Sequence, residues 1–243
     1  MITPTIILPG YLAGAKPYQE MASSLQSMGI PAVIVPLQRR DWLPTVGGRS
    51  MLPILQKLDQ TVQQVMAESG SDRVNLVGHS AGGWVARIYL GELPYDVHAA
   101  NAGQVCLWKA WAFVNTLITL GTPHVSQERW TKRNLDFVKN NYPGAFYDSV
   151  RYVCVAGKAS YGDRTWQSWF TYSSYELTCG QGNCWGDGIT PVESAHLAGA
   201  ENITLENVWH SPRPQKLWYG TPEVVKAWAT YLPGNTSLPG NTR

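Results

Sequence analysis

Short apolar runs alternate along this chain with longer stretches in which apolar residues recur at the spacing of a helix. A run of about four to eight apolar residues is typical of a buried strand, whereas helical spacing is typical of an amphipathic helix. The runs have apolar residues at successive positions, as expected for strands that are covered on both faces. They predict strands at residues 5–8, 32–37, 74–77, 114–120, 150–156 and 203–208.

Helical spacing predicts helices between these strands, at residues 17–28 and 51–68. A last helix is expected to start at Thr221, a good N-cap residue that Pro222 follows, and to end before Pro233. Strands that alternate with helices indicate an α/β fold, in which helices cover both faces of a parallel sheet.

The length of 243 residues suits one domain of this class. We expect it to span residues 1–233, and we expect the Gly- and Asn-containing tail at 234–243 to be flexible. The formal net charge of +2 provides no electrostatic footprint for nucleic acid. No apolar run is long enough for a transmembrane helix, and the N-terminus enters a predicted strand without the basic region of a signal peptide. The sequence therefore predicts a cytoplasmic protein.

Two stretches, at residues 92–111 and 157–185, interrupt the alternation. The second leaves the carboxyl end of a predicted strand, where loops surround the active site in folds of this kind. This second stretch is either a wall or lid of a binding pocket, or a packed loop that only covers the sheet. Neither of the two stretches has the long aliphatic helix that is typical of an interfacial lid. The second stretch is rich in aromatic residues, namely Tyr161, Trp166, Trp169, Phe170, Tyr172, Tyr175 and Trp185.

The strongest chemical signal is a Gly-x-Ser-x-Gly motif between a predicted strand and a predicted helix. Gly78, Ser80 and Gly82 form this motif, and an apolar helical pattern follows at residues 84–90. In a nucleophile elbow, the sharp strand-to-helix turn exposes a serine hydroxyl above the sheet. The five-residue motif alone is common, but its position between strand and helix indicates that Ser80 is a nucleophile.

A nucleophilic serine needs a histidine to accept its proton and a carboxylate to orient that histidine. In this fold class the order along the chain is Ser, then acid, then His, so His196 and His210 are the candidates. We favour His210, which follows the last predicted strand. The other histidines of the chain, His79, His98 and His124, are interpreted together with His196 as ordinary buried or surface residues.

The acid is expected to be Asp187, which lies between two glycines and before the histidine strand. Flanking glycines allow a tight turn that brings a carboxylate close to an imidazole. Asp163 and Glu193 are more distant alternatives.

An oxyanion hole needs two N–H donors. We expect Ala81 to provide one, because it directly follows the nucleophile, and Tyr11 to provide the other from the loop after the first strand, with Leu12 as the alternative.

Cysteine usage predicts no disulfide framework. Cys106 and Cys154 lie in apolar runs and are expected to be buried thiols, whereas Cys179 and Cys184 flank a Gly-rich turn and can bridge under oxidising conditions. No His/Cys pairs have the spacing of metal ligands, so we expect no metal and no other cofactor.

Five segments of the chain carry a further likeness, namely Leu8-Pro9-Gly10-Tyr11, Gly78-His79-Ser80-Ala81-Gly82-Gly83, Leu120-Gly121-Thr122-Pro123-His124, Gly186-Asp187-Gly188 and Val208-Trp209-His210. Taken together, they resemble the α/β-hydrolase-fold lipases and esterases, in a small form that lacks the first two strands of the fold. The Leu-Gly-Thr-Pro-His segment also recurs in GPI inositol deacylase-like proteins, and the Gly-Asp-Gly segment is similar to a subgroup of cyanobacterial and plant hydrolases. We expect Leu12, His79, His124 and Trp185 to line the pocket. For His124, the resemblance implies that it shapes the pocket or supports it from behind and does not act as the base. One departure is Pro9-Gly10, where many lipases have His-Gly.

The expected function is hydrolysis of carboxylic esters, of short-to-medium or lipid acyl groups, by a serine hydrolase of the carboxylesterase or triacylglycerol lipase type. The expected partner is a small-molecule or lipid ester, with transient contact to a lipid surface. Two alternatives stay open: a thioesterase or amidase on the same three residues, and a hydrolase-like protein that binds a small molecule without chemistry.

Overall fold

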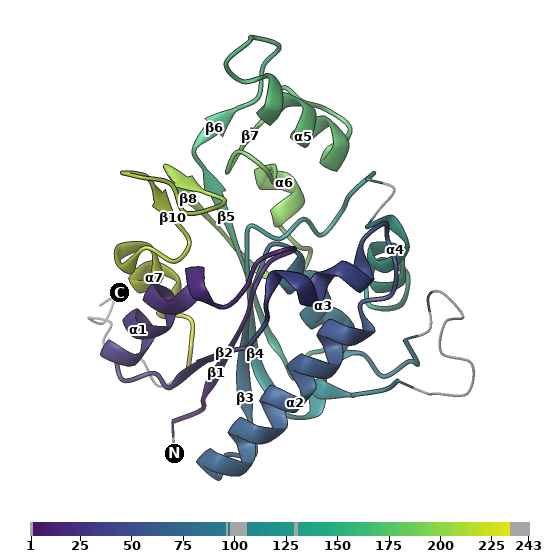
Figure 1. Ribbon diagram of the computed structural model, residues 1–243, viewed down its shortest axis with the longest axis vertical. Coiled ribbons are helices and arrows are strands. Elements are labelled where there is room, and N and C mark those ends of the chain that lie inside the picture. The colour runs from purple at the N-terminus through teal and green to yellow at the C-terminus, as the bar shows by residue number, and fades with distance from the viewer. Residues whose placement is uncertain (1, 96, 98–105, 129–130, 234–243) are drawn as a thin grey trace, which may run out of the picture.

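A parallel six-stranded sheet forms the centre of the molecule (Figure 1). The computed structural model describes residues 2–95, 97, 106–128 and 131–233, so His98, much of the 92–111 stretch and the 234–243 tail lie outside the described residues. The strand order is β2-β1-β3-β4-β5-β8, and every pairing between neighbours is parallel. The predicted α/β class with a six-stranded parallel sheet is confirmed. The strands are β1 (Thr5–Leu8), β2 (Ala32–Ile34), β3 (Val74–His79), β4 (Val114–Leu120), β5 (Arg151–Lys158) and β8 (Glu201–Glu206).

The edge strands differ most from the prediction. The run at 203–208 does not form one strand: β8 ends at Glu206, Asn207 has a positive φ of 60°, and a separate short strand, β9 (Val208–Trp209), follows. The left-handed residue turns the chain out of the sheet before His210. Because β8 is an edge strand, most of its residues are exposed, so the expectation of burial on both faces was wrong there.

Helices cover both faces of the sheet, each over its own hydrophobic core. On one face, Leu8 and Leu76 pack with residues of α2 and α3. On the other, Ile7 and Val77 pack with residues of α1 and α7. Neighbouring strand residues thus serve opposite cores, as the alternation of side chains along a strand requires. The helices are α1 (Gln19–Ser27), α2 (Leu52–Ser69), α3 (Ala81–Leu90), α4 (Lys132–Asn141), α5 (Trp169–Cys179), α6 (Val192–Ala195) and α7 (Pro222–Ala229).

The predicted helices form close to the expected positions. The 17–28 helix is divided into a 3₁₀ turn at Lys16–Tyr18 and α1. Helix α2 ends at Gly70, whose φ of 66° is the left-handed conformation that commonly terminates helices. Two further 3₁₀ turns lie at Arg39–Thr45 and Ala110–Ala112.

The aromatic stretch at 157–185 is more ordered than its sequence indicates. It projects from the carboxyl end of β5 and contains α5 and the antiparallel pair β6 (Ser160–Tyr161) and β7 (Trp185–Gly186), as Figure 1 shows. Apolar residues occur all round α5, so its sequence carries no stripe that would have revealed the helix. The last short strand, β10 (Leu217–Trp218), pairs with β9.

Candidate active site

Ser80 occupies a strained turn between β3 and α3. Its φ of 53° and ψ of −125° lie outside the regions that non-glycine residues normally adopt. Its N–H donates to the Leu120 carbonyl (2.8 Å), and its carbonyl accepts the Thr122 hydroxyl (2.9 Å). The neighbouring strand β4 and the segment after it thus hold the turn in place.

Two glycines make this turn sterically feasible. A Cβ at Gly78 would lie 2.5 Å from the Gly83 Cα, and a Cβ at Gly82 would lie 2.5 Å from the Leu8 carbonyl oxygen. Both contacts are with main-chain atoms that cannot rotate away. The motif therefore requires glycine on each side of Ser80.

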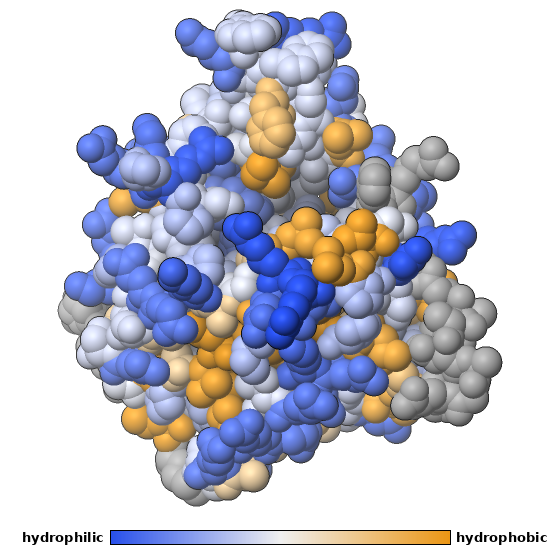
Figure 2. Space-filling view, in the orientation of Figure 1, coloured by the Kyte–Doolittle hydropathy of each residue, from blue (hydrophilic) through white to orange (hydrophobic). Residues whose placement is uncertain are grey.

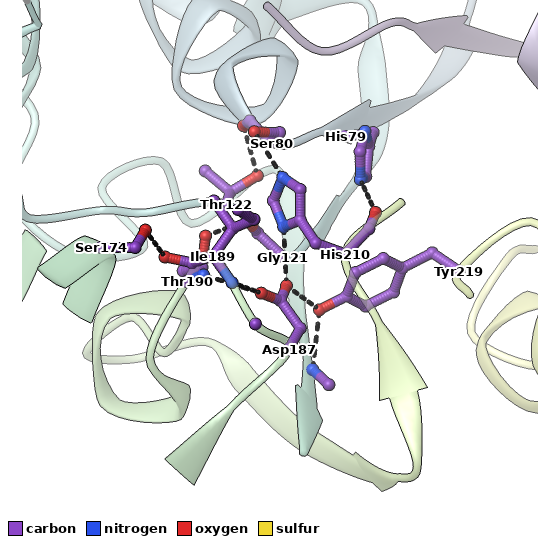
Figure 3. Close-up of polar contacts among 12 residues, drawn as sticks. His79, Ser80, Gly121, Thr122, Ser174, Asp187, Ile189, Thr190, His210 and Tyr219 are labelled. Atoms are coloured by element: carbon purple, nitrogen blue, oxygen red, sulfur yellow. Dashed lines mark hydrogen bonds and ion pairs between the residues drawn. The ribbon is translucent and has the colours of Figure 1, made fainter. Parts of the chain in front are cut away.

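His210 and Asp187 continue from Ser80 in a hydrogen-bonded chain (Figure 3). The Ser80 Oγ lies 3.0 Å from His210 Nε2, and His210 Nδ1 lies 2.8 Å from Asp187 Oδ2. An ionised carboxylate only accepts hydrogen bonds, so Nδ1 carries the proton and Nε2 is free to accept the Ser80 hydroxyl proton. His210 follows β9, and Asp187 follows β7.

The Asp187 carboxylate is buried and fully engaged. Its Oδ1 accepts the N–H groups of Ile189 (3.0 Å) and Thr190 (2.7 Å), and its Oδ2 also accepts the Tyr219 hydroxyl (2.8 Å). With only 1% of the residue exposed, these bonds replace the water that the charge has lost.

Tyr219 is a site residue that sequence reasoning missed. It is fully buried, and its hydroxyl accepts the Gly157 N–H (2.7 Å) while it donates to Asp187. Burial, reinforced by the negative charge of Asp187, raises the pKa of Tyr219 well above its usual value, so the phenol stays a donor. No local signal marks this residue, because its role depends on a contact between distant segments.

His79 connects the nucleophile turn to two loops. Its Nε2 lies 2.9 Å from the His210 carbonyl oxygen, so this nitrogen carries the proton, and Nδ1 accepts the Tyr18 hydroxyl (2.8 Å). The Tyr18 oxygen in turn accepts the Gly10 N–H (2.8 Å). Burial, and to a lesser extent the neighbouring His210, lowers the pKa of His79 to about 3. The neutral ring thus ties the loop after β1 to the loop that carries His210.

Tyr11 and Ala81 lie beside Ser80 in one cavity. Among the described residues, neither of their N–H groups donates a hydrogen bond to protein. The loop that carries Tyr11 is held by the Ala13 N–H on the Gly10 carbonyl (3.0 Å) and by the Trp42 indole N–H on the Ala13 carbonyl (2.9 Å).

Two cavities meet at Ser80. The first, which we call the apolar cavity, has a volume of about 400 Å³ and is lined mainly by apolar side chains, among them Leu12, Val46, Trp84, Leu177 and Ile189. The second, the cationic cavity, has a volume of about 680 Å³, and its walls include His79, His210, Lys16, Arg39 and Trp218. Figure 2 shows a hydrophobic group of side chains beside a strongly hydrophilic one near the centre of this face.

The aromatic stretch contributes to the apolar cavity through α5, but not through its rings. Ser174, Leu177 and Thr178 of α5 line this cavity. Trp185 does not: it is half exposed and lines a separate hollow with Tyr161, so its expected place in the pocket was wrong. In the pair of β6 and β7, Trp185 lies opposite Tyr161, and the two rings contact each other with centroids 5.4 Å apart.

His124 is buried away from both cavities at Ser80. Its Nδ1 accepts the Arg87 guanidinium (3.2 Å), and its Nε2 lies 3.2 Å from the Thr119 hydroxyl. Of the two places expected for it, the pocket wall was wrong, since it lines a different hollow beside α4. The structure places Leu12 in the walls of both cavities at Ser80 and His79 in those of the cationic cavity.

The alternative acids and bases do not approach Ser80. Asp163 is engaged with Thr165 and Ser168 in its own loop, and Glu193 lies in α6. His196 lies next to the Thr204 hydroxyl (3.3 Å).

The cysteines are thiols in the structure. Cys106 and Cys154 are buried, as predicted, whereas Cys179 and Cys184 are partly exposed and both direct their Sγ toward the Gln181 carbonyl.

Within the part of the chain that the structure describes, no group of three His, Cys, Asp or Glu side chains is arranged to hold a metal ion. The helices in that part are too short or too polar to cross a membrane.

Comparison with known proteins agrees with this architecture. Residues 45–142 match the family described as PGAP1-like alpha/beta domain. The mature lipase BlEst2 of Bacillus licheniformis is similar in structure, with a TM-score of 0.61 and 18% identity over 95% of this chain and 89% of that one. No curated protein matches the chain in sequence.

Two further solved structures share the fold. Phospholipase PlaB of Legionella pneumophila has a TM-score of 0.57 and 13% identity, covering 95% of this chain and 64% of that one. A monoacylglycerol lipase of Paleococcus ferrophilus has a TM-score of 0.53 and 11% identity, covering 97% of each chain. With its parallel sheet and its strand-to-helix turn at a serine, the chain therefore shares the overall α/β fold of these three solved structures.

Proposed function

We propose that this protein is a serine hydrolase of carboxylic esters. The observation that carries the proposal is the chain from Ser80 Oγ through His210 to the buried Asp187, with distances of 3.0 and 2.8 Å. Such a chain can remove the proton of the serine hydroxyl as the oxygen attacks a carbonyl carbon, which is how an otherwise weak nucleophile is activated.

The reaction has two halves. Ser80 Oγ bonds to the ester carbonyl carbon, and its proton passes to His210 Nε2. The carbon–oxygen bond of the ester then breaks, and His210 returns the proton to the departing alcohol, which leaves an acyl group on Ser80. Water attacks this acyl group while His210 Nε2 takes a proton from it. The bond between the acyl carbon and Ser80 Oγ then breaks, His210 returns the proton to Ser80 Oγ, and the carboxylic acid is released. Asp187 holds His210 in the required tautomer, and no cofactor takes part in any step.

The N–H groups of Tyr11 and Ala81 are proposed to stabilise the negative oxygen of each tetrahedral intermediate. Support comes from their position in the wall beside Ser80 and from the lack of any other acceptor for them among the described residues. Donors that are already in place are effective because they need no reorganisation during the reaction.

Covalent labelling tests the proposal. A fluorophosphonate should add once to the wild-type protein, at Ser80, and Ser80→Ala should abolish the adduct. Ser126→Ala is the matched control and should retain labelling. Ser126 lines the same cavity, and among the described residues its hydroxyl has no hydrogen bond to a histidine and accepts the Glu128 N–H. A folded wild-type protein that forms no adduct would favour the alternative of a binding protein without chemistry.

The acyl group is proposed to be of short to medium length. The apolar cavity beside Ser80 has a volume of about 400 Å³, which is at the small end of ligand sites. In a series of p-nitrophenyl esters, kcat/KM should therefore be highest for short or medium chains, and an optimum at long chains would contradict this.

Thioester and amide analogues of the same acyl groups test the thioesterase and amidase alternatives.

Transient contact with a lipid surface is proposed for the tip of the 157–185 stretch. Trp166 is 97% exposed, Phe170 68% and Trp169 57%, and Arg164 lines the same shallow hollow. Tryptophan is enriched at membrane interfaces, where its ring is partly buried among lipid headgroups.

A further inference from the structure

The two cavities at Ser80 are chemically different, and only one of them reaches His210. Ser80, Tyr11 and Leu12 line both. His210 lines the cationic cavity and is absent from the walls of the apolar one, where Ala81 is found instead. A substrate bound at Ser80 thus has two unlike compartments for its two halves.

The position of His210 decides which half enters which compartment, and this step rests on the proposed function. His210 must give its proton to the departing alcohol oxygen, so that oxygen has to lie within hydrogen-bond reach of Nε2. The alcohol half therefore extends into the cationic cavity. The acyl half then lies in the apolar cavity, whose apolar walls suit a hydrocarbon chain.

The cationic cavity carries two positive side chains from separate segments. Lys16 begins the 3₁₀ turn before α1, and Arg39 begins the 3₁₀ turn after β2. Both side chains are exposed, and among the described residues neither takes part in an ion pair. The wall contains two cations that are available to a ligand.

No carboxylate offsets these charges in the described walls of the cavity. The acid nearest to Arg39 along the chain, Asp41, is paired with Lys57 (2.9 Å) and also accepts the Gln38 N–H (2.7 Å). The acid nearest to Lys16, Glu20, is exposed and lies outside the described walls of this cavity. The apolar cavity, by contrast, has Glu128 in its wall. Among the described residues, the sign of the charge therefore differs between the alcohol side and the acyl side.

We propose that the alcohol half of the substrate carries a phosphate group, which Lys16 and Arg39 bind in the cationic cavity. A guanidinium can bind phosphate through two parallel hydrogen bonds, and an ammonium contributes a point charge. Hydrolysis breaks the acyl carbon–oxygen bond and adds water across it. The products are a carboxylic acid and the phosphorylated alcohol, with the phosphate ester intact.

The test compares two soluble esters that differ in one group, 1-hexanoylglycerol and 1-hexanoylglycerol 3-phosphate, at constant ionic strength and below their micelle concentrations. Wild-type kcat/KM should be higher for the phosphorylated ester, by a factor on the order of ten. The double variant K16Q/R39Q should lose this ratio. Arg40→Gln is the matched control, since Arg40 is an exposed neighbour outside the cavity wall, and it should retain the ratio.

The soluble esters form the first arm of the test. A second arm asks whether the phosphate belongs to the ester of a free phosphorylated alcohol or to a lipid headgroup in a membrane. It uses phosphatidylcholine vesicles that contain either didecanoylglycerol or didecanoyl phosphatidic acid as the substrate, so that the acyl chains stay within the proposed medium length. A phosphate preference that K16Q/R39Q removes and Arg40→Gln keeps would support the proposal in either arm, and the arm in which it occurs identifies the source. Equal hydrolysis of phosphorylated and neutral esters in both arms would overturn the inference and leave the proposed function intact. Absence of hydrolysis of every ester, together with no fluorophosphonate adduct, would refute the proposed function and the inference with it.

Discussion

The Asp187 carboxylate receives four hydrogen bonds, and their geometry fixes the plane in which His210 must lie. Two come from main-chain N–H groups of its own turn, one from Tyr219 and one from His210. A buried charge of this kind is tolerated only when its lone pairs are satisfied. The residue thus has two roles, to keep the turn intact and to orient the imidazole.

Asp187→Asn separates these two roles. The amide oxygen can still accept the N–H groups of Ile189 and Thr190, so the protein should remain folded. The amide cannot hold the His210 proton on Nδ1 as a carboxylate does, so kcat for ester hydrolysis should fall by on the order of 10³ to 10⁴. Steady-state kinetics measure the loss, and thermal unfolding checks the fold.

Asp163→Asn is the control for that substitution. Asp163 is a carboxylate between Ser80 and His210 in sequence, but it bonds only within its own loop. Its kcat should match that of the wild type. If Asp187→Asn retained wild-type kcat while Asp163→Asn lost activity, the acid would be assigned wrongly.

At the scale of single elements, α5 and the turn before it present two unlike surfaces. Ser174, Leu177 and Thr178 face the apolar cavity. Near the start of the helix, Trp166, Trp169 and Phe170 are exposed to solvent. Large exposed rings that gather in one segment indicate an interaction surface, and this one adjoins the wall of the proposed acyl site.

Replacing these three rings tests the contact with lipid. The triple variant W166Q/W169Q/F170Q should bind phosphatidylcholine vesicles at least tenfold more weakly than the wild type. Each substitution removes up to about 2 kcal/mol of the binding free energy that burial of the ring among lipids provides. Vesicle co-sedimentation measures the partition. Phe146→Gln, which removes an exposed ring from another segment, should leave it unchanged. Equal binding by all three proteins would exclude this surface.

At the scale of the whole molecule, two buried neutral histidines link stability to pH. Burial lowers the pKa of His79 to about 3, and burial together with the charge of Arg87 lowers the pKa of His124 well below its usual value. In the unfolded chain both titrate near pH 6.5. Between these values the unfolded state binds more protons than the folded state, so stability falls as the pH falls.

His124→Asn should weaken this dependence. Asn retains an acceptor for Arg87 but takes up no proton, and it lies outside the cavities at Ser80. Below pH 6.5, the wild-type unfolding free energy should fall more steeply than that of the variant, by up to about 1.4 kcal/mol per pH unit. Urea unfolding at several pH values gives both slopes, and the difference at pH 7.5 gives the packing cost alone. Parallel slopes would show that His124 is already protonated in the folded protein.

The sequence predicted which helices and strands form better than it predicted where each one ends. The strand at 114–120 forms as expected, and α2 begins and ends within one residue of the predicted range. Where the prediction was wrong, at 203–208, one residue with a positive φ, Asn207, divides the run. Periodicity describes apolar surface and cannot show that the chain turns away within an apolar run.

The strand-to-helix turn at Ser80 and the chain order of serine, acid and histidine were determined by the sequence alone, because glycine spacing and apolar periodicity act over neighbouring residues. Only the tertiary structure decided that Tyr219 bonds to Asp187, that Trp185 faces outward, and that Lys16 and Arg39 share a wall with Ser80. These contacts join segments far apart in the chain. They depend on strand order and on the path of each loop, which local patterns do not encode.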